Sequence, residues 1–419
     1  MHTENADVAK IFLWDMKGLY PIAQTLSQSF SSKILLEMGS PCVEAGEAVA
    51  YEVYEIHGES KVQLQKGEYS IEENGLTVDY DNNTITFLTD GIKNVKLTSS
   101  GVAHITPVVV NDSSSEVSVK GSAQFQSDFT TDTALNTYLA DGGSGYTITS
   151  LADGGKALST VKSTAVDTLL FGPELADYSV EMEFTPTKLS GSGVNYLGIG
   201  LRAQDKAKPP AYRVGVFERD TFRGTELKYN RLGIGRGEKP LSGAWHYGNI
   251  SENPFNNGNT FALNEKYKLV ASIVGDKITG ALYDKNGRLI DTISTTTSDC
   301  NYSESGKPTE NMLSGKTILS FQCMVADISD ITIYGFDKAG KIEILQPSDT
   351  VYEGDSINLQ TVAGSSPLDN GMVEYTAISG FDIDGSTAIA KAPGTHTIIA
   401  TYTDYSGKTK HTAIEITVN

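Results

Sequence analysis

The sequence predicts an all-β fold built from three β-sandwiches in tandem. Short segments such as residues 178–184, 196–202 and 267–273 alternate apolar and polar side chains and are rich in β-branched and aromatic types, the pattern of half-buried strands. Turn residues separate them, including many of the 41 glycines, and none continues into helical periodicity. Because 419 residues are too many for one ordinary core, two to four domains are expected.

Charge and cysteine content narrow the possible partners. The net charge is −19 and the isoelectric point about 4.7, so the surface repels phosphate backbones and anionic lipid. We therefore expect no nucleic-acid partner and no membrane insertion. An acidic surface is compatible with Ca²⁺ binding and with an extracellular protein, or it serves solubility alone.

Three cysteines, Cys42, Cys300 and Cys323, cannot form a closed disulfide framework. Both a Cys300–Cys323 bridge and free thiols therefore stay open.

Residues 1–31 are expected to be a strand and linker that follow a preceding module. Residues 7–15 form one predicted strand, and a lone strand has no partner of its own. The segment resembles a junction in large secreted multimodular proteins of Firmicutes, which implies that a larger protein extends upstream; the alternative is a local β-arm. The resemblance is carried by Lys10, Phe12, Trp14, Asp15, Leu19, Pro21 and Ile22.

Residues 32–112 and 341–419 are predicted to be two related small sandwiches. In the first, residues 47–54 and 84–88 alternate well, and turn residues recur at the spacing of an Ig-like domain. The second repeats its opening strand, glycine-acidic turn and next strand without a gap. Residues 394–418 resemble the final hairpin of bacterial Ig-like domains, which implies an Ig-like fold for 341–419 and a spacer role, with adhesion as a less common use.

A polar linker at 111–115 leads into the large central domain, residues 117–337. The strand-like segments 167–171, 178–184, 196–202 and 330–334 resemble those of concanavalin-like (laminin-G-like) jelly rolls of bacterial carbohydrate-active proteins. The resemblance covers most of this domain and implies the jelly-roll fold. It implies sugar binding only as the commonest use of that fold, because a fold does not fix a function.

The sequence offers little for catalysis. Glycosidases need two carboxylates across the scissile bond, and Glu181 with Glu183 is the nearest arrangement. A third acid is missing, and the neighbouring apolar residues indicate that the pair lies on a solvated outer face. A polysaccharide lyase would need a tyrosine or histidine base beside an arginine, which Tyr212, His246 and Arg213 could supply. The fragment is expected to be an ancillary part of a carbohydrate-active enzyme rather than the enzyme itself.

Aromatic and planar polar residues cluster in the middle of the central domain. Sugars are bound by aromatic faces against C–H surfaces and by planar groups that hydrogen-bond hydroxyls. Residues 243–258 are too rich in glycine and asparagine for a strand and are predicted to be a long functional loop. Trp245 either contacts the ligand or plugs the core beneath that loop. The predicted ligand-binding residues are Arg202, Tyr212, Arg213, Trp245, His246, Tyr247 and Asn249.

Arg202 and Arg213 fall on adjacent predicted strands of the concave sheet, where they would suit a carboxylated sugar or form a structural pair with Glu181 or Glu218. Sandwiches of this kind often join their first and last strands through an oxygen-ligated Ca²⁺ ion. Asp128 and Asp330 are placed for such a structural site.

The function predicted is a non-catalytic carbohydrate-binding region of a secreted or cell-wall-associated bacterial protein. A monomer is expected to bind a polysaccharide or a host or plant glycan on the concave face of the central domain. Two alternatives stay open: a catalytic sandwich, either glycoside hydrolase or polysaccharide lyase, that acts on an acidic polysaccharide, and a spacer or adhesin with a protein partner.

Overall fold

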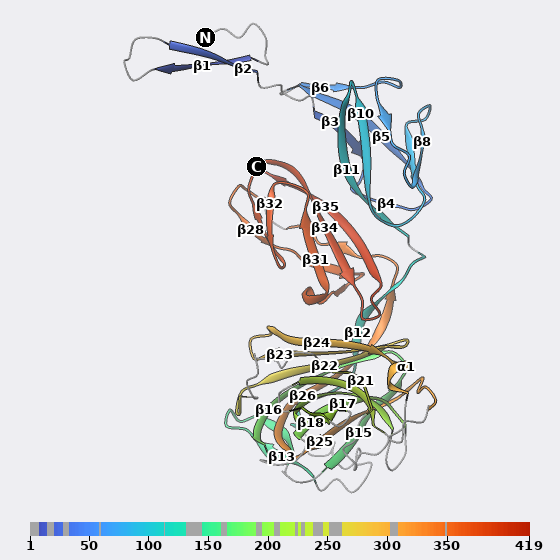
Figure 1. Cartoon of the computed structure of the whole chain (residues 1–419), viewed down its shortest axis with the longest axis vertical. Coiled ribbons are helices and arrows are strands. Elements are labelled where there is room, and N and C mark those ends of the chain that lie inside the picture. Colours follow the sequence, from blue (N-terminus) through green and yellow to red (C-terminus); the bar gives the residue numbers. More distant parts are fainter. Residues whose placement is uncertain are drawn as a thin grey trace. The chain divides into compact units, whose positions relative to one another are not determined.

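The computed structural model describes residues 8–14, 21–27, 33–57, 60–112, 114–130, 145–160, 166–189, 195–204, 210–222, 225–227, 231–237, 246–250, 262–301, 309–347 and 350–419. The chain divides into two compact units (Figure 1). The first comprises Met1–Glu116, Gly340–Tyr402 and Thr409–Asn419, and the second comprises Val117–Ala339 and Thr403–Lys408.

The predicted all-β class is confirmed. Among the described residues the only α-helix is the single turn α1 (Thr297–Cys300). Its start is fixed by a capping box, in which Thr296 and Asp299 each accept from the other's backbone N–H. No helix in the described part of the chain is long and apolar enough to cross a membrane. Cys42, Cys300 and Cys323 are free thiols, so no Cys300–Cys323 bridge forms.

The N-terminal segment forms a hairpin rather than a lone strand. β1 (Val8–Trp14) pairs antiparallel with β2 (Pro21–Ser27), from Val8 opposite Ser27 to Trp14 opposite Pro21. The sequence predicts only the first of these strands, and β2 supplies its missing partner.

The first unit contains a small sandwich that follows this hairpin. Apolar side chains from both of its sheets form one core that includes Ile34, Val53, Ile85, Phe87 and Leu97. One sheet has the order β3 (Lys33–Met38), β5 (Ala48–His57), β9 (Thr84–Phe87), β8 (Leu76–Asp79), with β6 (Ser60–Gln63) beside β5. The other has the order β4 (Cys42–Glu44), β11 (Val102–Asn111), β10 (Gly91–Ser99), β7 (Ser70–Ile71).

The C-terminal part of the first unit has three small sheets. Their orders are β27 (Glu343–Ile344), β29 (Thr361–Ala363), β30 (Ser366–Pro367); β28 (Ser356–Asn358), β33 (Thr387–Ala390), β32 (Phe381–Asp384); and β31 (Val373–Ala377), β34 (Gly394–Thr403), β35 (Thr409–Val418). The single turn η3 (Asn370–Met372) precedes β31.

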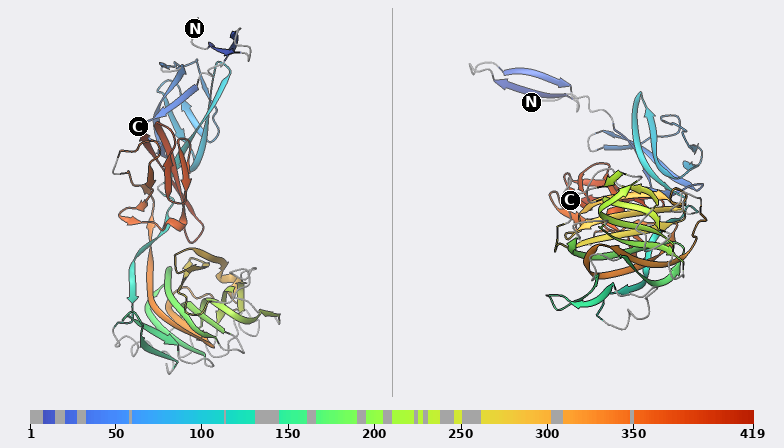
Figure 2. Two further views of the ribbon diagram at one scale, coloured as in Figure 1. Left: turned by 90° about the vertical axis from the view of Figure 1, so that its left-hand side faces the viewer. Right: turned by 60° about the horizontal axis from the view of Figure 1, so that its bottom comes forward.

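The second unit is a two-sheet sandwich whose layers are visible in Figure 2. The first sheet runs β13 (Tyr146–Ser150), β14 (Lys156–Thr160), β26 (Met324–Ala339), β16 (Tyr178–Leu189), β22 (Tyr267–Val274), β23 (Lys277–Asp284), β24 (Leu289–Thr296), with β12 (Val117–Ser127) beside β26. The second sheet runs β15 (Val166–Leu175), β25 (Gly315–Gln322), β17 (Asn195–Ala203), β18 (Ala211–Phe222), β20 (Arg231–Gly237), β21 (His246–Ile250), with β19 (Thr225–Leu227) beside β18.

Strict alternation builds the core between these two sheets. On β16 the residues Val180, Met182 and Phe184 are fully buried, and on β17 the residues Leu197 and Ile199 face them from the second sheet. Successive side chains of a strand point to opposite faces, so the intervening residues of the second sheet lie on its outer face, away from this core. That outer face carries the candidate site.

Candidate functional site

Three cross-strand rows form the outer face of the second sheet. The middle row places Ser320 of β25 opposite Gly198 of β17, Gly198 opposite Gly215 of β18, and Gly215 opposite Gly233 of β20. We call Gly198, Gly215 and Gly233 the glycine row. Because glycine has no side chain, another group can approach the backbone closely along this row.

Aromatic rings border one side of the glycine row. Tyr196 of β17 pairs with Phe217 of β18 in the next row, and their ring centroids lie 5.7 Å apart at an interplanar angle of 41°. Gln322 of β25 lies beside Tyr196 in the same row. Tyr196 and Phe217 are 0% and 2% exposed. Both rings are therefore buried in this structure.

The other side of the glycine row carries the guanidinium of Arg213. Arg213 lies opposite Gly200 of β17 and Gly235 of β20. Its side chain is 0% exposed and crosses toward the end of β20, since a Cβ atom built on Gly237 would meet Arg213 Nε at 2.5 Å. A side chain at position 237 would displace the guanidinium, so this glycine is needed for close approach rather than for flexibility.

Two buried polar groups beside the glycine row deserve notice for their hydrogen bonding within the described residues. The Oγ of Ser320 and the Oε1 of Gln322 are buried, and neither has a partner in the part of the chain that the structure describes. Both belong to β25, two residues apart, so both face outward. A buried polar atom without a partner costs about 1–3 kcal/mol and calls for a specific explanation. A bound hydroxylated molecule would supply the missing hydrogen bonds.

Arg202 does not join this face. It lies at a register shift of β17 with a φ of 52°, in the left-handed region, and it is 3% exposed. Nε donates to Ala176 O (2.7 Å), Nη1 donates to Met312 O (3.1 Å), and Nη2 donates to Gly275 O (2.8 Å) and Asp177 Oδ1 (3.1 Å). These four bonds hold separate segments of the central unit together. The structural alternative predicted Glu181 or Glu218 as the acid that pairs with the arginines, but the acid that pairs with Arg202 is Asp177.

Tyr212 points to the opposite face from Arg213 and belongs to the core. Its hydroxyl donates to Asn301 Oδ1 (3.0 Å) and accepts from Met312 N (3.2 Å), and burial raises its pKa. Arg236, which the sequence analysis did not select, donates from Nη1 to the same Asn301 oxygen (3.1 Å). A ligand over the glycine row would contact Arg213 but would not contact Tyr212.

The segment expected to be a loop contains a strand. β21 (His246–Ile250) pairs with β20, with Tyr247 opposite Gly235 and Asn249 opposite Ile234. Register puts Tyr247 in the same cross-strand row as Arg213. Trp245 lies outside the described residues, so its assignment stays a prediction. β20 supplies the edge with which a glycine- and asparagine-rich segment can pair despite its low strand propensity.

Asp128 and Asp330 lie near one another but do not form a ligand cluster. Asp128 Oδ1 accepts from the backbone N of Thr130 (3.0 Å), and Asp330 Oδ1 accepts from the hydroxyl of Thr332 (3.0 Å). Burial raises the pKa of Asp330, and nearby Glu183 and Asp128 raise it further. In the described ranges no group of three or more His, Cys, Asp or Glu residues could hold a metal. The Ca²⁺ site stays a prediction.

Glu181 and Glu183 lie on the solvated outer face of the first sheet, as the sequence analysis expected. Glu181 forms ion pairs with Lys120 and with Lys268, the latter at 3.5 Å, and Glu183 pairs with Lys266 at 3.0 Å. Both carboxylates are therefore engaged by lysine side chains on this outer face. This geometry gives no support to a glycosidase pair on β16.

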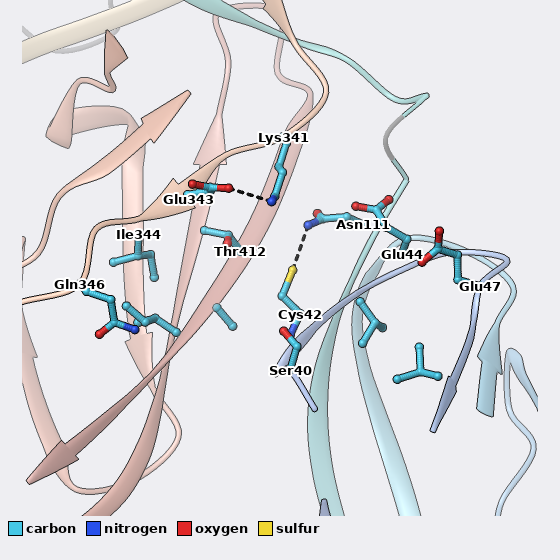
Figure 3. Close-up of a pocket in the computed structure, with 14 residues that line it drawn as sticks. Ser40, Cys42, Glu44, Glu47, Asn111, Lys341, Glu343, Ile344, Gln346 and Thr412 are labelled. Atoms are coloured by element: carbon cyan, nitrogen blue, oxygen red, sulfur yellow. Dashed lines mark hydrogen bonds and ion pairs between the residues drawn. The ribbon is translucent and has the colours of Figure 1, made fainter. Parts of the chain in front are cut away.

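A cavity of about 500 Å³ lies in the first unit and is shown in Figure 3. Asn111 Nδ2 lies 3.0 Å from Cys42 Sγ, and Lys341 pairs with Glu343 at 2.7 Å. Burial raises the pKa of the Cys42 thiol, which keeps it protonated and unreactive. The lining has no aromatic side chain, so it lacks the stacking surface that a sugar ring requires.

Comparison with models of protein families gave no match, and neither did comparison with curated proteins. Among solved structures, the carbohydrate-binding module CBM66 from Bacillus subtilis is 18% identical, with 46% of this chain and 96% of that chain covered, at a TM-score of 0.31. A Bacillus subtilis protein of unknown function with a galectin-like fold is 12% identical over 52% and 98%, at 0.35. A GH43 protein from Bacillus licheniformis is 9% identical over 77% and 70%, at 0.33. Likeness at this level carries no information about ligand or activity.

Proposed function

We propose that this chain is a non-catalytic carbohydrate-binding region, and that a glycan binds over the glycine row of the central unit. The observation that carries the proposal is a pair of buried oxygens on β25, Ser320 Oγ and Gln322 Oε1, that have no hydrogen-bond partner among the described residues. They lie beside an aromatic pair and a backbone that lacks side chains. Sugar hydroxyls would complete their hydrogen bonds while the C–H surface of the sugar lies against the rings.

Arg213 defines the expected ligand chemistry. A guanidinium recognises hydroxyl pairs and carboxylates through its planar set of donors. The acidic chain carries a net charge of −19, which repels long polyanions at a distance. We therefore propose a neutral or sparsely carboxylated polysaccharide as the partner. A secreted or cell-wall-associated bacterial protein is the setting in which such a region would meet that partner.

A substitution at Gln322 tests this function through two readouts that should move in opposite directions. Gln322→Leu keeps the volume and removes the unpartnered acceptor. We expect the free energy of unfolding to rise by about 1 kcal/mol, because the desolvation cost disappears. Binding on a glycan array and by titration calorimetry should weaken about tenfold, equivalent to about 1.4 kcal/mol. Gln124→Leu, which replaces an exposed amide on β12 of the other sheet, should leave binding unchanged.

The outcomes separate the candidate functions. Unchanged glycan binding by Gln322→Leu would remove the glycine row from the site. If the chain binds no glycan on the array, the remaining candidate function is that of a spacer or an adhesin with a protein partner. Sugar products released from bound polysaccharides would show a catalytic sandwich, for which the ion-paired Glu181 and Glu183 give no basis.

A further inference from the structure

A second cavity, of about 270 Å³, lies in the small sandwich of the first unit. It occurs where β5 changes neighbours. Tyr54 of β5 still pairs with Gln63 of β6, whereas Ala50 already pairs with Thr84 of β9. Between these pairs this edge of β5 changes partner, and two isolated bonds between described residues continue the sheet: Leu64 N to Val53 O (2.9 Å) and Tyr51 N to Asn83 O (3.0 Å).

Three tyrosines line this cavity: Tyr51 and Tyr69, which are 3% and 8% exposed and belong to the core of the sandwich, and Tyr80, which is half-buried. Tyr51 and Tyr69 meet edge to face with ring centroids 6.2 Å apart, and Tyr69 and Tyr80 lie 6.0 Å apart at 45°. The Tyr69 hydroxyl donates to the Tyr51 hydroxyl (3.1 Å), and the Tyr80 hydroxyl accepts from Ile71 N (3.0 Å). These bonds fix the rings without a ligand, so the wall is preorganised.

Planar polar side chains form the outer rim. Glu52, Gln63 and Gln65 are exposed, and Gln63 Nε2 donates to Glu52 Oε1 at 3.3 Å. Across the opening, Lys66 forms an ion pair with Asp81. Both of these side chains are well exposed, and exposed ion pairs contribute little stability, so a ligand could open this one at small cost.

We propose that this cavity is a saccharide site separate from the one in the central unit, and that it takes one neutral sugar ring. Aromatic rings behind and carboxylate and amide groups in front are the two elements that hold a sugar. The volume lies just below the roughly 300–1,000 Å³ of drug-sized ligand pockets, which suits a single ring. Glu52 and Asp81 outnumber Lys66, so a uronate would be repelled.

The test uses the full chain and saturation-transfer difference NMR with a panel of neutral monosaccharides, namely glucose, galactose, mannose, fructose, xylose and arabinose, plus glucuronate. We expect saturation transfer to at least one neutral sugar, with a Kd on the order of 1 mM, and none to glucuronate. Gln63→Ala/Gln65→Ala should abolish that signal, because both amides are exposed and their removal leaves the core intact. Asn94→Ala, an exposed amide on β10 of the other sheet, is the matched control and should keep the signal.

Three results would overturn the inference: no transfer to any neutral sugar, transfer that survives Gln63→Ala/Gln65→Ala, or equal transfer to glucuronate. Gln322→Leu identifies which site a bound sugar occupies. A signal lost in Gln63→Ala/Gln65→Ala but kept in Gln322→Leu belongs to this cavity and holds even if the central unit binds no glycan. A signal kept in Gln63→Ala/Gln65→Ala but lost in Gln322→Leu would show that the sugar binds in the central unit and not in this cavity.

Discussion

Replacing Arg202 with methionine should destabilise the central unit strongly and leave sugar recognition to other residues. Arg202 is 3% exposed, and its guanidinium donates four hydrogen bonds to four different residues. Hydrogen bonds to charged groups contribute about 1.5–3 kcal/mol each, but the released carbonyls regain some water contact. Because Asp177 is 34% exposed, no buried charge is left unpaired, and the expected loss of about 3 kcal/mol comes from the hydrogen bonds to the three carbonyls.

Urea unfolding followed by tryptophan fluorescence measures this loss. A Trp14→Phe background leaves Trp245 as the single tryptophan, so the signal comes from the central unit. Arg288→Met replaces an exposed arginine in the β23–β24 turn and should change stability by less than about 0.5 kcal/mol. A loss below about 1 kcal/mol for Arg202→Met would refute the structural role assigned from its contacts. Lost glycan binding at unchanged stability would return Arg202 to the ligand-contacting set.

Two further substitutions test other parts of the chain. Lys410 is 2% exposed, and its Nζ donates to the backbone carbonyls of Asp112 (2.6 Å) and Ser115 (3.0 Å). Lys410→Met should therefore lower the free energy of unfolding of the first unit by about 2 kcal/mol in urea unfolding. An unchanged free energy of unfolding would show that these bonds do not fix the 111–115 linker. The pKa of Asp330 is raised, first by burial and then by the nearby charges of Glu183 and Asp128. The ionised carboxylate therefore destabilises the folded state at neutral pH. This penalty is relieved as the pH falls through the folded-state pKa toward the unfolded-state pKa. Asp330→Asn should therefore stabilise by up to about 1 kcal/mol at pH 7 and flatten that pH dependence. Added Ca²⁺ should raise the melting temperature of the natural chain but not of Asp330→Asn, and a rise in both would move the predicted Ca²⁺ site elsewhere.

The alternation of β-strands made the fold predictable. The apolar neighbours of Glu181 and Glu183 on β16, namely Val180, Met182 and Phe184, are fully buried, as strand alternation predicts. The same rule should have separated Tyr212 from Arg213, because neighbouring residues of one strand cannot face the same side. Tyr212 and Arg213 are both among the predicted ligand-binding residues because of their residue types. The strand register shows that Arg213 lies beside the glycine row and that Tyr212 lies in the core.

Arg202 could not have been placed from the sequence. Alternation from Tyr196 would put it on the outer face, but a positive φ and a register shift turn its side chain into the protein. β21 was missed for a related reason, since its pairing depends on the edge of β20 rather than on its own residues. The tyrosine-lined cavity depends on a change of partner along one edge of β5, which no local pattern indicates.

Glycan binding by a Gly215→Val chain tests the central claim most directly. Gly215 is the middle member of the buried glycine row, and valine suits a strand, so a row that takes up a ligand should also accommodate this side chain. We predict a free energy of unfolding within about 1 kcal/mol of the natural chain and at least a tenfold loss of glycan affinity. Unchanged affinity, or a loss of several kcal/mol as in an overpacked core, would show instead that the protein's own side chains fill this face.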